Sequence, residues 1–221
     1  MSTPATVIQG QTALLPGGEE SSTAQAVRRR IQAAAKHKFA RFGFDGTLYS
    51  DVARSADLSP AELSLYFDSK LDMLMAVFDE GWGEINQRLG DILLSSVNAR
   101  EAALSMLALM MRILDRDEDL ARLLLFESRR PDPESGAIRL SDGYRRFERL
   151  CVDLAVRGQK DGSFSASHNP RLIACVMIGA VESLMRSQVI GEQQYGVAPF
   201  TPAEVFTAFE TLMLALNPRP Y

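Results

Sequence analysis

The sequence predicts an all-α protein, built from a small N-terminal unit of three helices and a larger C-terminal helical region. Apolar residues recur at helical spacing along most of the chain, whereas the strict alternation of a half-buried strand is poor. Three helix starts carry a capping residue followed directly by proline, at Ser59, Asn169 and Thr201. The length of 221 residues and the hydrophobic content of 46% suit one ordinary domain or a small domain fused to a larger one.

Nine helices are expected, separated by segments rich in proline, glycine and polar residues. We expect a disordered arm over residues 1–22, the three-helix unit over 23–70 and the larger helical region over 71–221. The first helix is expected over 23–42, and two short helices follow between 47 and 67. The later helices are expected over 70–96, 99–116, 118–128, 135–160, 169–190 and 201–216.

The segment from Gly43 to Lys70 is the most informative part of the chain. Thr47 can cap the first short helix, because its hydroxyl can accept from free N–H groups of the first turn. A turn at 57–58 leads to Ser59, which forms a capping box with Glu62. Two short helices joined by a tight turn can lay the second helix in a groove of DNA.

This segment and the helix before it share one continuous register of framework residues. These residues are Arg30, Ile31, Ala34, Ala35, Phe39, Phe42, Gly43, Phe44, Asp45, Gly46, Thr47, Asp51, Val52, Ala53, Ala56, Leu58, Ser59, Leu63, Tyr66, Phe67, Ser69 and Lys70. In this register, residues 28–78 resemble the N-terminal domain of TetR-family transcriptional regulators without gaps. The resemblance implies a helix-turn-helix DNA-binding domain followed by a helical ligand-binding and dimerisation domain.

The basic cluster at Arg28, Arg29 and Arg30 is the first candidate for DNA contact. Cations are unfavourable at a helix N-terminus, so three arginines near the predicted start suggest a phosphate partner, although a solvated helix end stays open from the residues alone. In the resembling family the start of this helix lies near the DNA backbone, so the resemblance favours the phosphate contact. The resemblance implies further backbone contacts from Thr47, Tyr66 and Lys70, and a groove-facing surface on the second short helix. The DNA-binding residues expected in total are Arg28, Arg29, Arg30, Thr47, Ser59, Pro60, Ala61, Ser64, Leu65, Tyr66 and Lys70.

The helix expected to enter the groove has few residues that can read bases. It has no Arg, Lys, Asn or Gln between Ser59 and Phe67, so the bidentate base contacts worth about 1–3 kcal/mol each cannot come from it. The family usually has a tyrosine where this chain has Ser64 and a glycine where it has Asp57. We therefore expect modest sequence discrimination, with a large share of affinity from phosphate contacts.

The net charge of −4 is unevenly distributed along the chain. Between residues 24 and 75 there are eight Lys and Arg against six Asp and Glu, so the N-terminal domain is only mildly basic. Cys151 and Cys175 lie in apolar helical settings and favour a reducing cytoplasm over a disulfide. The longest apolar run, Leu172 to Val181, is about half the ~20 residues that a membrane span requires.

The C-terminal region is apolar and rich in methionine, which suits either an ordinary core or an adaptable apolar pocket. The resemblance implies a small-molecule cavity there, and no cofactor or metal is expected. The expected pocket residues are Trp82, Met106, Met110, Phe126, Phe147 and Met177. The last two helices are apolar over more than one stripe, which favours burial against a second subunit. The expected dimer contacts are Leu172, Val176, Ala180, Leu184, Phe206, Phe209 and Met213.

Two functions remain open from the sequence. The first is a ligand-responsive regulator that binds a palindromic operator in double-stranded DNA as a homodimer and acts as a repressor, with an apolar small-molecule effector. The alternative is a helical dimer of the same fold that binds a small molecule or protein partner, with weak or no specific DNA binding. An enzyme is disfavoured, because His37 and His168 stand alone and neither metal-ligand spacing nor a Gly-rich phosphate loop occurs.

Overall fold

The computed structural model describes residues 19–127, 136–196 and 200–216. Within these ranges the chain forms nine α-helices and no strand, which confirms the predicted class. The helices are α1 (Glu19–Phe42), α2 (Tyr49–Ser55), α3 (Pro60–Leu63), α4 (Lys70–Ser95), α5 (Ala99–Arg116), α6 (Glu118–Glu127), α7 (Asp142–Asp161), α8 (Pro170–Tyr195) and α9 (Pro202–Ala215).

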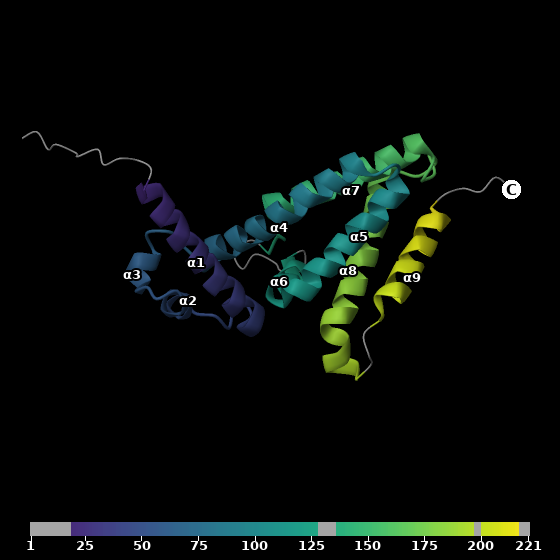
Figure 1. The fold of residues 1–221 in the computed structure, drawn as a ribbon. Coiled ribbons are helices and arrows are strands. Elements are labelled where there is room, and N and C mark those ends of the chain that lie inside the picture. The colour runs from purple at the N-terminus through teal and green to yellow at the C-terminus, as the bar shows by residue number, and fades with distance from the viewer. Residues whose placement is uncertain (1–18, 128–135, 197–199, 217–221) are drawn as a thin grey trace, which may run out of the picture.

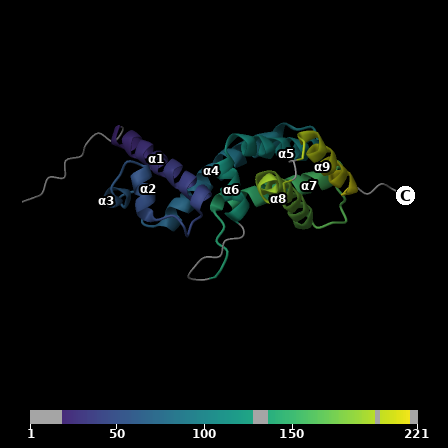
Figure 2. The ribbon, with the colours of Figure 1, turned by 90° about the horizontal axis from the view of Figure 1, so that it is seen from below.

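Two groups of helices lie at opposite ends of the molecule (Figure 1). The helices α1, α2 and α3 form one end, and α5, α7, α8 and α9 lie toward the other. The long helix α4 runs from the first group into the second, and α6 lies between the two groups in both views (Figure 2). Because α1 packs against both α4 and α6, the N-terminal unit meets the rest of the chain over two surfaces.

The N-terminal unit has its own small core. Ile31 and Ala35 from α1 are fully buried against Val52 and Ala53 from α2 and Leu63 from α3. Full burial of one such aliphatic side chain contributes about 1.5–3 kcal/mol to folding. These residues belong to the framework register noted in the sequence, so the register is a set of packing positions.

The C-terminal region is organised around the contact between α4 and α7. Trp82 on α4 stacks on Phe147 with 4.7 Å between ring centroids and meets Tyr144 edge-on at 5.5 Å. The helices approach closely at Gly143, where a Cβ atom would lie 2.4 Å from the Cβ of Trp82. The Asn86 side chain donates to the Gly143 carbonyl at 2.8 Å and fixes the first turn of α7 against α4.

Two helix starts differ from the sequence-based expectation. The first helix begins at Glu19 and not near residue 23, so 19–22 belong to α1 and the expected arm is shorter, its remainder lying outside the described residues. The helix expected over 135–160 begins at Asp142, because the Ser141 hydroxyl accepts from the Tyr144 N–H and caps it there. Residue 135 itself lies outside the described part of the chain.

The contact between α1 and the start of α6 joins the two units through charged groups. The Lys36 ammonium pairs with one carboxylate oxygen of Asp117, and the other oxygen accepts from the Leu120 N–H at 2.9 Å, which caps α6. One residue along α1, the His37 Nδ1 lies 2.9 Å from a carboxylate oxygen of Asp119. A shift of α6 would therefore act directly on α1.

Candidate DNA-binding surface and effector cavity

The turn between α2 and α3 is fixed by the predicted capping box. The Ser59 hydroxyl oxygen accepts from the Glu62 N–H at 3.2 Å. The Glu62 carboxylate accepts in return from the Ser59 N–H at 2.7 Å and from its hydroxyl at 2.8 Å. These bonds hold the pKa of Glu62 below its ordinary value. The carboxylate is therefore turned back toward the start of α3, as predicted.

Asp57 ends α2 in a left-handed backbone conformation, with φ of 54°. Among the described residues it is the only non-glycine with positive φ. Its N–H donates to the Arg54 carbonyl at 3.2 Å, and the next N–H, from Leu58, donates to the Ala53 carbonyl at 2.9 Å. These bonds satisfy the last carbonyls of α2, so the turn needs a left-handed residue at the position where the family usually has glycine.

The exposed face of α3 consists of the four residues expected to face a groove. Pro60, Ala61, Ser64 and Leu65 are all exposed, and Leu65 is 81% exposed. The Ser64 hydroxyl donates to the Ala61 carbonyl at 2.8 Å. Leu63, on the opposite side, is buried in the domain core. Glu62 is also exposed, but its carboxylate is held by Ser59, so the small, uncharged side chains form the rest of the surface that can meet a ligand as large as DNA.

The role expected of Thr47 is wrong. The N-cap of α2 is Leu48, and Thr47 is buried, with 1% of its surface exposed. Its hydroxyl donates toward the Gly43 carbonyl at 2.8 Å and the Lys38 carbonyl at 3.1 Å. Thr47 therefore closes the loop between α1 and α2, and its side chain is not presented to a phosphate.

Lys70 also has a structural partner where a phosphate was expected. Its ammonium donates to the Phe44 carbonyl at 2.8 Å and to the Thr47 carbonyl at 2.7 Å. It also lies 4.5 Å from the centre of the Phe44 ring. The cation at the start of α4 is therefore stabilised by the loop that it holds, and this explains its position without DNA.

The arginine cluster lies in the third turn of α1, because α1 begins at Glu19. Arg28 donates to the Tyr66 carbonyl at 3.0 Å and lies 4.2 Å from the centre of the Phe67 ring, so it ties α1 to the segment after α3. Arg29 and Arg30 are exposed. A phosphate contact therefore remains the prediction for Arg29 and Arg30.

Tyr66 is half-buried beside the core.

Tyr49 has a structural role that its place in the sequence did not indicate. The Tyr49 hydroxyl donates to the Phe67 carbonyl at 2.7 Å, and burial raises its pKa. Tyr49 therefore links the first turn of α2 to Phe67, which follows α3. Its place in the sequence, directly after an exposed leucine, gives no signal of this contact.

An apolar void of about 30 Å³ lies inside the C-terminal region. Four of the six predicted pocket residues line it: Met106, Met110, Phe147 and Met177. Its other walls are Leu89, Ala103, Leu107, Cys151, Ile178, Val181 and Phe209. Ligand pockets usually measure about 300–1,000 Å³, so this void would have to widen to hold an effector.

Trp82 and Phe126 do not line the void. The Trp82 indole N–H donates to the Glu127 carboxylate at 2.6 Å. Phe126 is 55% exposed and points away from the core, because the buried positions around it on α6 are Leu124, Leu125 and Glu127. The buried Glu127 carboxylate, which also accepts from the Ser141 N–H at 2.8 Å, has a pKa raised by desolvation.

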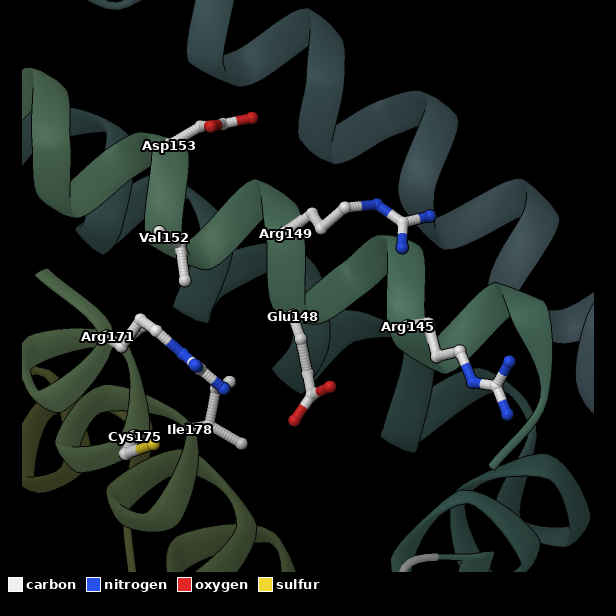
Figure 3. A pocket seen from close by; sticks show the side chains of 9 residues that line it. Arg145, Glu148, Arg149, Val152, Asp153, Arg171, Cys175 and Ile178 are labelled. Carbon is white, nitrogen blue, oxygen red and sulfur yellow. The ribbon is translucent and has the colours of Figure 1, made fainter. Parts of the chain in front are cut away.

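A second cavity, of about 440 Å³, lies between α7 and α8 and carries charge. Figure 3 shows Glu148 from α7 and Arg171 from α8 extending into the space between the helices, beside Ile178. Arg145, Arg149 and Asp153 also line it, with Val152, Ala174 and Cys175. The sequence analysis missed this site, because charges on one face of an amphipathic helix are normally a solvated surface.

The expected dimer residues fall into two sets. On α8, Leu172 is 57% and Val176 36% exposed, and Ala180 and Leu184 are partly exposed. On α9, Phe206 is partly exposed, but Phe209 and Met213 are at most 2% exposed within the single chain. The last two are therefore core residues, and the predicted α9 contacts at these positions are wrong.

The helix α8 is unusually apolar for its exposure. Between Pro170 and Val189 it is long and apolar enough to cross a membrane, with mean hydropathy 1.4, and 28% of this apolar stretch is buried in the single chain.

Within the part of the chain that the structure describes, no group of three His, Cys, Asp or Glu side chains is placed to hold a metal ion.

The chain is similar to known proteins both in sequence and in fold. Residues 31–77 match the family model described as bacterial regulatory proteins, tetR family. This segment of the chain therefore resembles the N-terminal domain of TetR-family transcriptional regulators. The match covers the second half of α1, all of α2 and α3 and the first turns of α4, which are the helices that carry the capped turn and the exposed α3 face.

The likeness of this chain to individual proteins extends well beyond the matched segment. It is 21% identical over 162 residues to the fatty acid metabolism regulator protein of Bacillus subtilis (strain 168), covering 73% of this chain and 83% of that protein. The solved fatty acid degradation regulator FadR of Bacillus halodurans superposes with TM-score 0.73 at 20% identity, over 85% of this chain and 94% of that one. The FadR of Bacillus subtilis, solved in complex with stearoyl-CoA, superposes with TM-score 0.72 at 19% identity. This superposition covers 87% of this chain and 99% of that one.

These superpositions show that the TetR-family fold includes the C-terminal helices. The void and the cavity of this chain therefore lie within helices that belong to the shared fold.

Proposed function

We propose that this protein is a ligand-responsive repressor that binds a palindromic operator as a homodimer and leaves it when an effector binds. The observation that carries the proposal is the capped turn that presents the uncharged face of α3, within a segment that matches the TetR family. The relatives reported above are named as regulators of fatty acid metabolism.

The DNA contact that we propose combines a small groove-facing surface with arginines on α1. Pro60 and Ala61 can contact thymine methyl groups, and Ser64 can offer a hydroxyl to a base edge. Arg29 and Arg30 are exposed and can pair with phosphates. Ser59, Leu65 and Tyr66 remain expected contacts at the rim of this surface.

The dimer that we propose is formed by the apolar face of α8. Leu172 and Val176 lie one turn apart on that face, and Ala180 and Leu184 continue the same stripe. A helix that is apolar over its exposed surface needs a partner to cover it, and a second copy of the same helix is self-complementary. The partly exposed Phe206 on α9 extends this surface.

The effector that we propose is a long-chain acyl compound, with acyl-CoA as the first candidate. The B. subtilis relative was solved with stearoyl-CoA. In this chain three methionines line the small void, and their unbranched, flexible side chains can repack to admit an alkyl chain. No residue of α6 lines the void, but α6 packs against α5 and α8, which do line it. A displacement of α5 or α8 would therefore reach α6, and the pairs Lys36–Asp117 and His37–Asp119 would pass it to α1.

Selection from random duplex DNA by the full-length protein, at two salt concentrations, tests this function. We expect enriched palindromes whose half-sites lie about 34–36 Å apart, which is one turn of DNA. Stearoyl-CoA is then expected to lower the affinity for the selected site. The absence of any enriched sequence at low salt would contradict the proposal.

A second function is favoured by the same α3 surface. Because α3 offers no guanidinium, ammonium or amide group, a helical dimer that binds a ligand or protein with only weak DNA affinity is also consistent with the chain. In that case, selection at low salt would yield no preferred sequence, while effector binding would persist.

A further inference from the structure

The structure assigns the charged cavity between α7 and α8 to the head group of an amphipathic effector, and we infer that the alkyl chain enters the apolar void past Ile178. The expected ligand class is a long acyl chain, joined by a neutral linker with N–H or O–H donors to a phosphate group. This inference rests on the proposed function, because it takes the effector to be a long-chain acyl compound.

The cavity and the void are separated by a wall one side chain thick. Ile178 lines both of them. On α8 the preceding residue, Met177, lines only the void; on α7, Cys151 lines the void and its neighbour Val152 lines the cavity. Rotation of the Ile178 side chain, which is partly exposed, would therefore connect a polar chamber to an apolar one.

The size and charge of the cavity suit a polar head group. Its volume of about 440 Å³ falls within the range of about 300–1,000 Å³ typical of ligand sites. Arg145, Arg149 and Arg171 line it against two carboxylates, and guanidinium groups bind phosphate oxygens in a bidentate manner. Arg145 makes only a 3.5 Å contact with Asp142, in which both side chains are exposed.

Glu148 defines which head groups are accepted. Figure 3 shows its carboxylate pointing into the space between α7 and α8, which Ile178 and Arg171 also line. A free fatty acid that enters past Ile178 would bring its own carboxylate beside Glu148, and like charges repel. A neutral linker with donors would instead hydrogen-bond to Glu148 and place its phosphate farther out, among the arginines.

Binding to the full-length protein can be followed through the single tryptophan. Trp82 stacks on Phe147, which lines the void, so an alkyl chain in the void should change its fluorescence. The probes are stearoyl-CoA, stearoyl lysophosphatidic acid, stearate and coenzyme A, each below its micelle concentration, with calorimetry as a second readout. The two phosphate-bearing amphiphiles distinguish a nucleotide head from a lipid head.

Arg171→Gln and Glu148→Gln test the head group, and Ile178→Phe tests the passage. The matched control is Arg146→Gln, an exposed arginine on α7 that does not line the cavity. We expect Arg171→Gln to weaken binding of the phosphate amphiphiles by about tenfold or more, and to weaken stearate binding by a smaller factor. Glu148→Gln should strengthen stearate binding, and Ile178→Phe should reduce stearoyl-CoA affinity to that of coenzyme A.

Two results would overturn the inference in distinguishable ways. If Arg171→Gln and Arg146→Gln both bind stearoyl-CoA like wild type, the head group lies elsewhere and the proposed function stands. If wild type binds neither phosphate amphiphile, both the inference and the proposed acyl effector fail. Operator selection without any effector then decides separately whether the DNA-binding part of the proposed function holds.

Discussion

Asp57 lies in the turn of the helix-turn-helix, in a left-handed backbone conformation that lowers the stability of the folded chain. In the left-handed region a side chain with a Cβ costs about 1–2 kcal/mol relative to the right-handed one, less for Asp, and glycine is free of that cost. Asp57 keeps φ at 54° because two backbone bonds at the end of α2 depend on it.

We therefore expect Asp57→Gly to have a larger free energy of unfolding than Asp57→Ala, by about 1 kcal/mol. Urea denaturation of the two variants measures the difference. The control pair is Arg54→Gly and Arg54→Ala, at a helical position where the Arg54 side chain is 79% exposed. There the order should reverse, because glycine weakens a helix interior. The same order at both positions would contradict the account of Asp57.

Glu127 gives the fold a pH dependence. Burial raises the pKa of its carboxyl above the ordinary value, although hydrogen bonds from Ser141 and Trp82 partly oppose the rise. A folded state that holds a proton more tightly than the unfolded state is stabilised at low pH, and it loses that contribution as pH rises through the raised pKa.

We expect the wild-type free energy of unfolding to fall relative to Glu127→Gln as pH rises from the ordinary value of 4.5 through the raised pKa. Urea denaturation of both proteins across this pH range measures the difference. Glu148→Gln, at an exposed carboxylate of α7, should show no comparable change. A difference between wild type and Glu127→Gln that stays flat with pH would contradict the assignment of a raised pKa to this group.

Single residues were predicted well where a local backbone pattern defined them. The Ser59–Glu62 capping box and the exposed α3 face follow from neighbours within four residues. The Thr47 hydroxyl also reaches the Lys38 carbonyl, nine residues away. Arg28 and Lys70 reach carbonyls 23 to 38 residues away, which only the folded domain brings near. The sequence therefore could not separate a contact with DNA from one with the domain itself.

At the scale of elements, the packing of α4 against α7 depends on Gly143. A Cβ there would lie 2.4 Å from the Trp82 Cβ, which is backbone-anchored and cannot rotate away. Elsewhere on α4, Gly83 and Gly90 have no atom within 4 Å of a Cβ position. These three glycines are indistinguishable in the sequence, yet only one of them marks a close helix approach.

Gly143→Ala is expected to lower the free energy of unfolding by about 1–3 kcal/mol, because the two helices must separate. Gly83→Ala is the matched control, and it should raise stability by about 0.5–1 kcal/mol through helix propensity. Thermal and urea unfolding of both variants provide the measurement. Equal effects of the same sign would show that α4 and α7 are not in close contact at Gly143.

Helix order and most helix lengths follow from capping and periodicity, and the misplaced start of α7 shows where these signals fail. The Ser141 cap depends on Glu127, which comes from α6 and accepts from the Ser141 N–H at 2.8 Å. No local pattern predicts this contact. The charged cavity was missed for a related reason, since it exists only where the polar face of α7 meets α8.

At the scale of the whole molecule, the exposed apolar face of α8 predicts a dimer. Leu172→Glu with Val176→Glu should convert the protein to a monomer, because two carboxylates in an apolar interface are unpaired and desolvated. Analytical ultracentrifugation measures the change. Leu94→Glu is the control, since Leu94 is 87% exposed on α4. A double variant that remains dimeric would place the interface on another face.

The central claim is that this chain binds a palindromic operator as a dimer and releases it when an acyl effector binds. Fluorescence anisotropy on the selected palindrome, a single half-site and a scrambled duplex, with and without stearoyl-CoA, tests it most directly. We expect the palindrome to bind most tightly. The ratio of its affinity to that of the scrambled duplex should stay far below one million. Stearoyl-CoA should weaken binding of the palindrome and leave the other two duplexes unaffected. Equal affinity for the palindrome and the scrambled duplex at low salt, unchanged by stearoyl-CoA, would contradict the account.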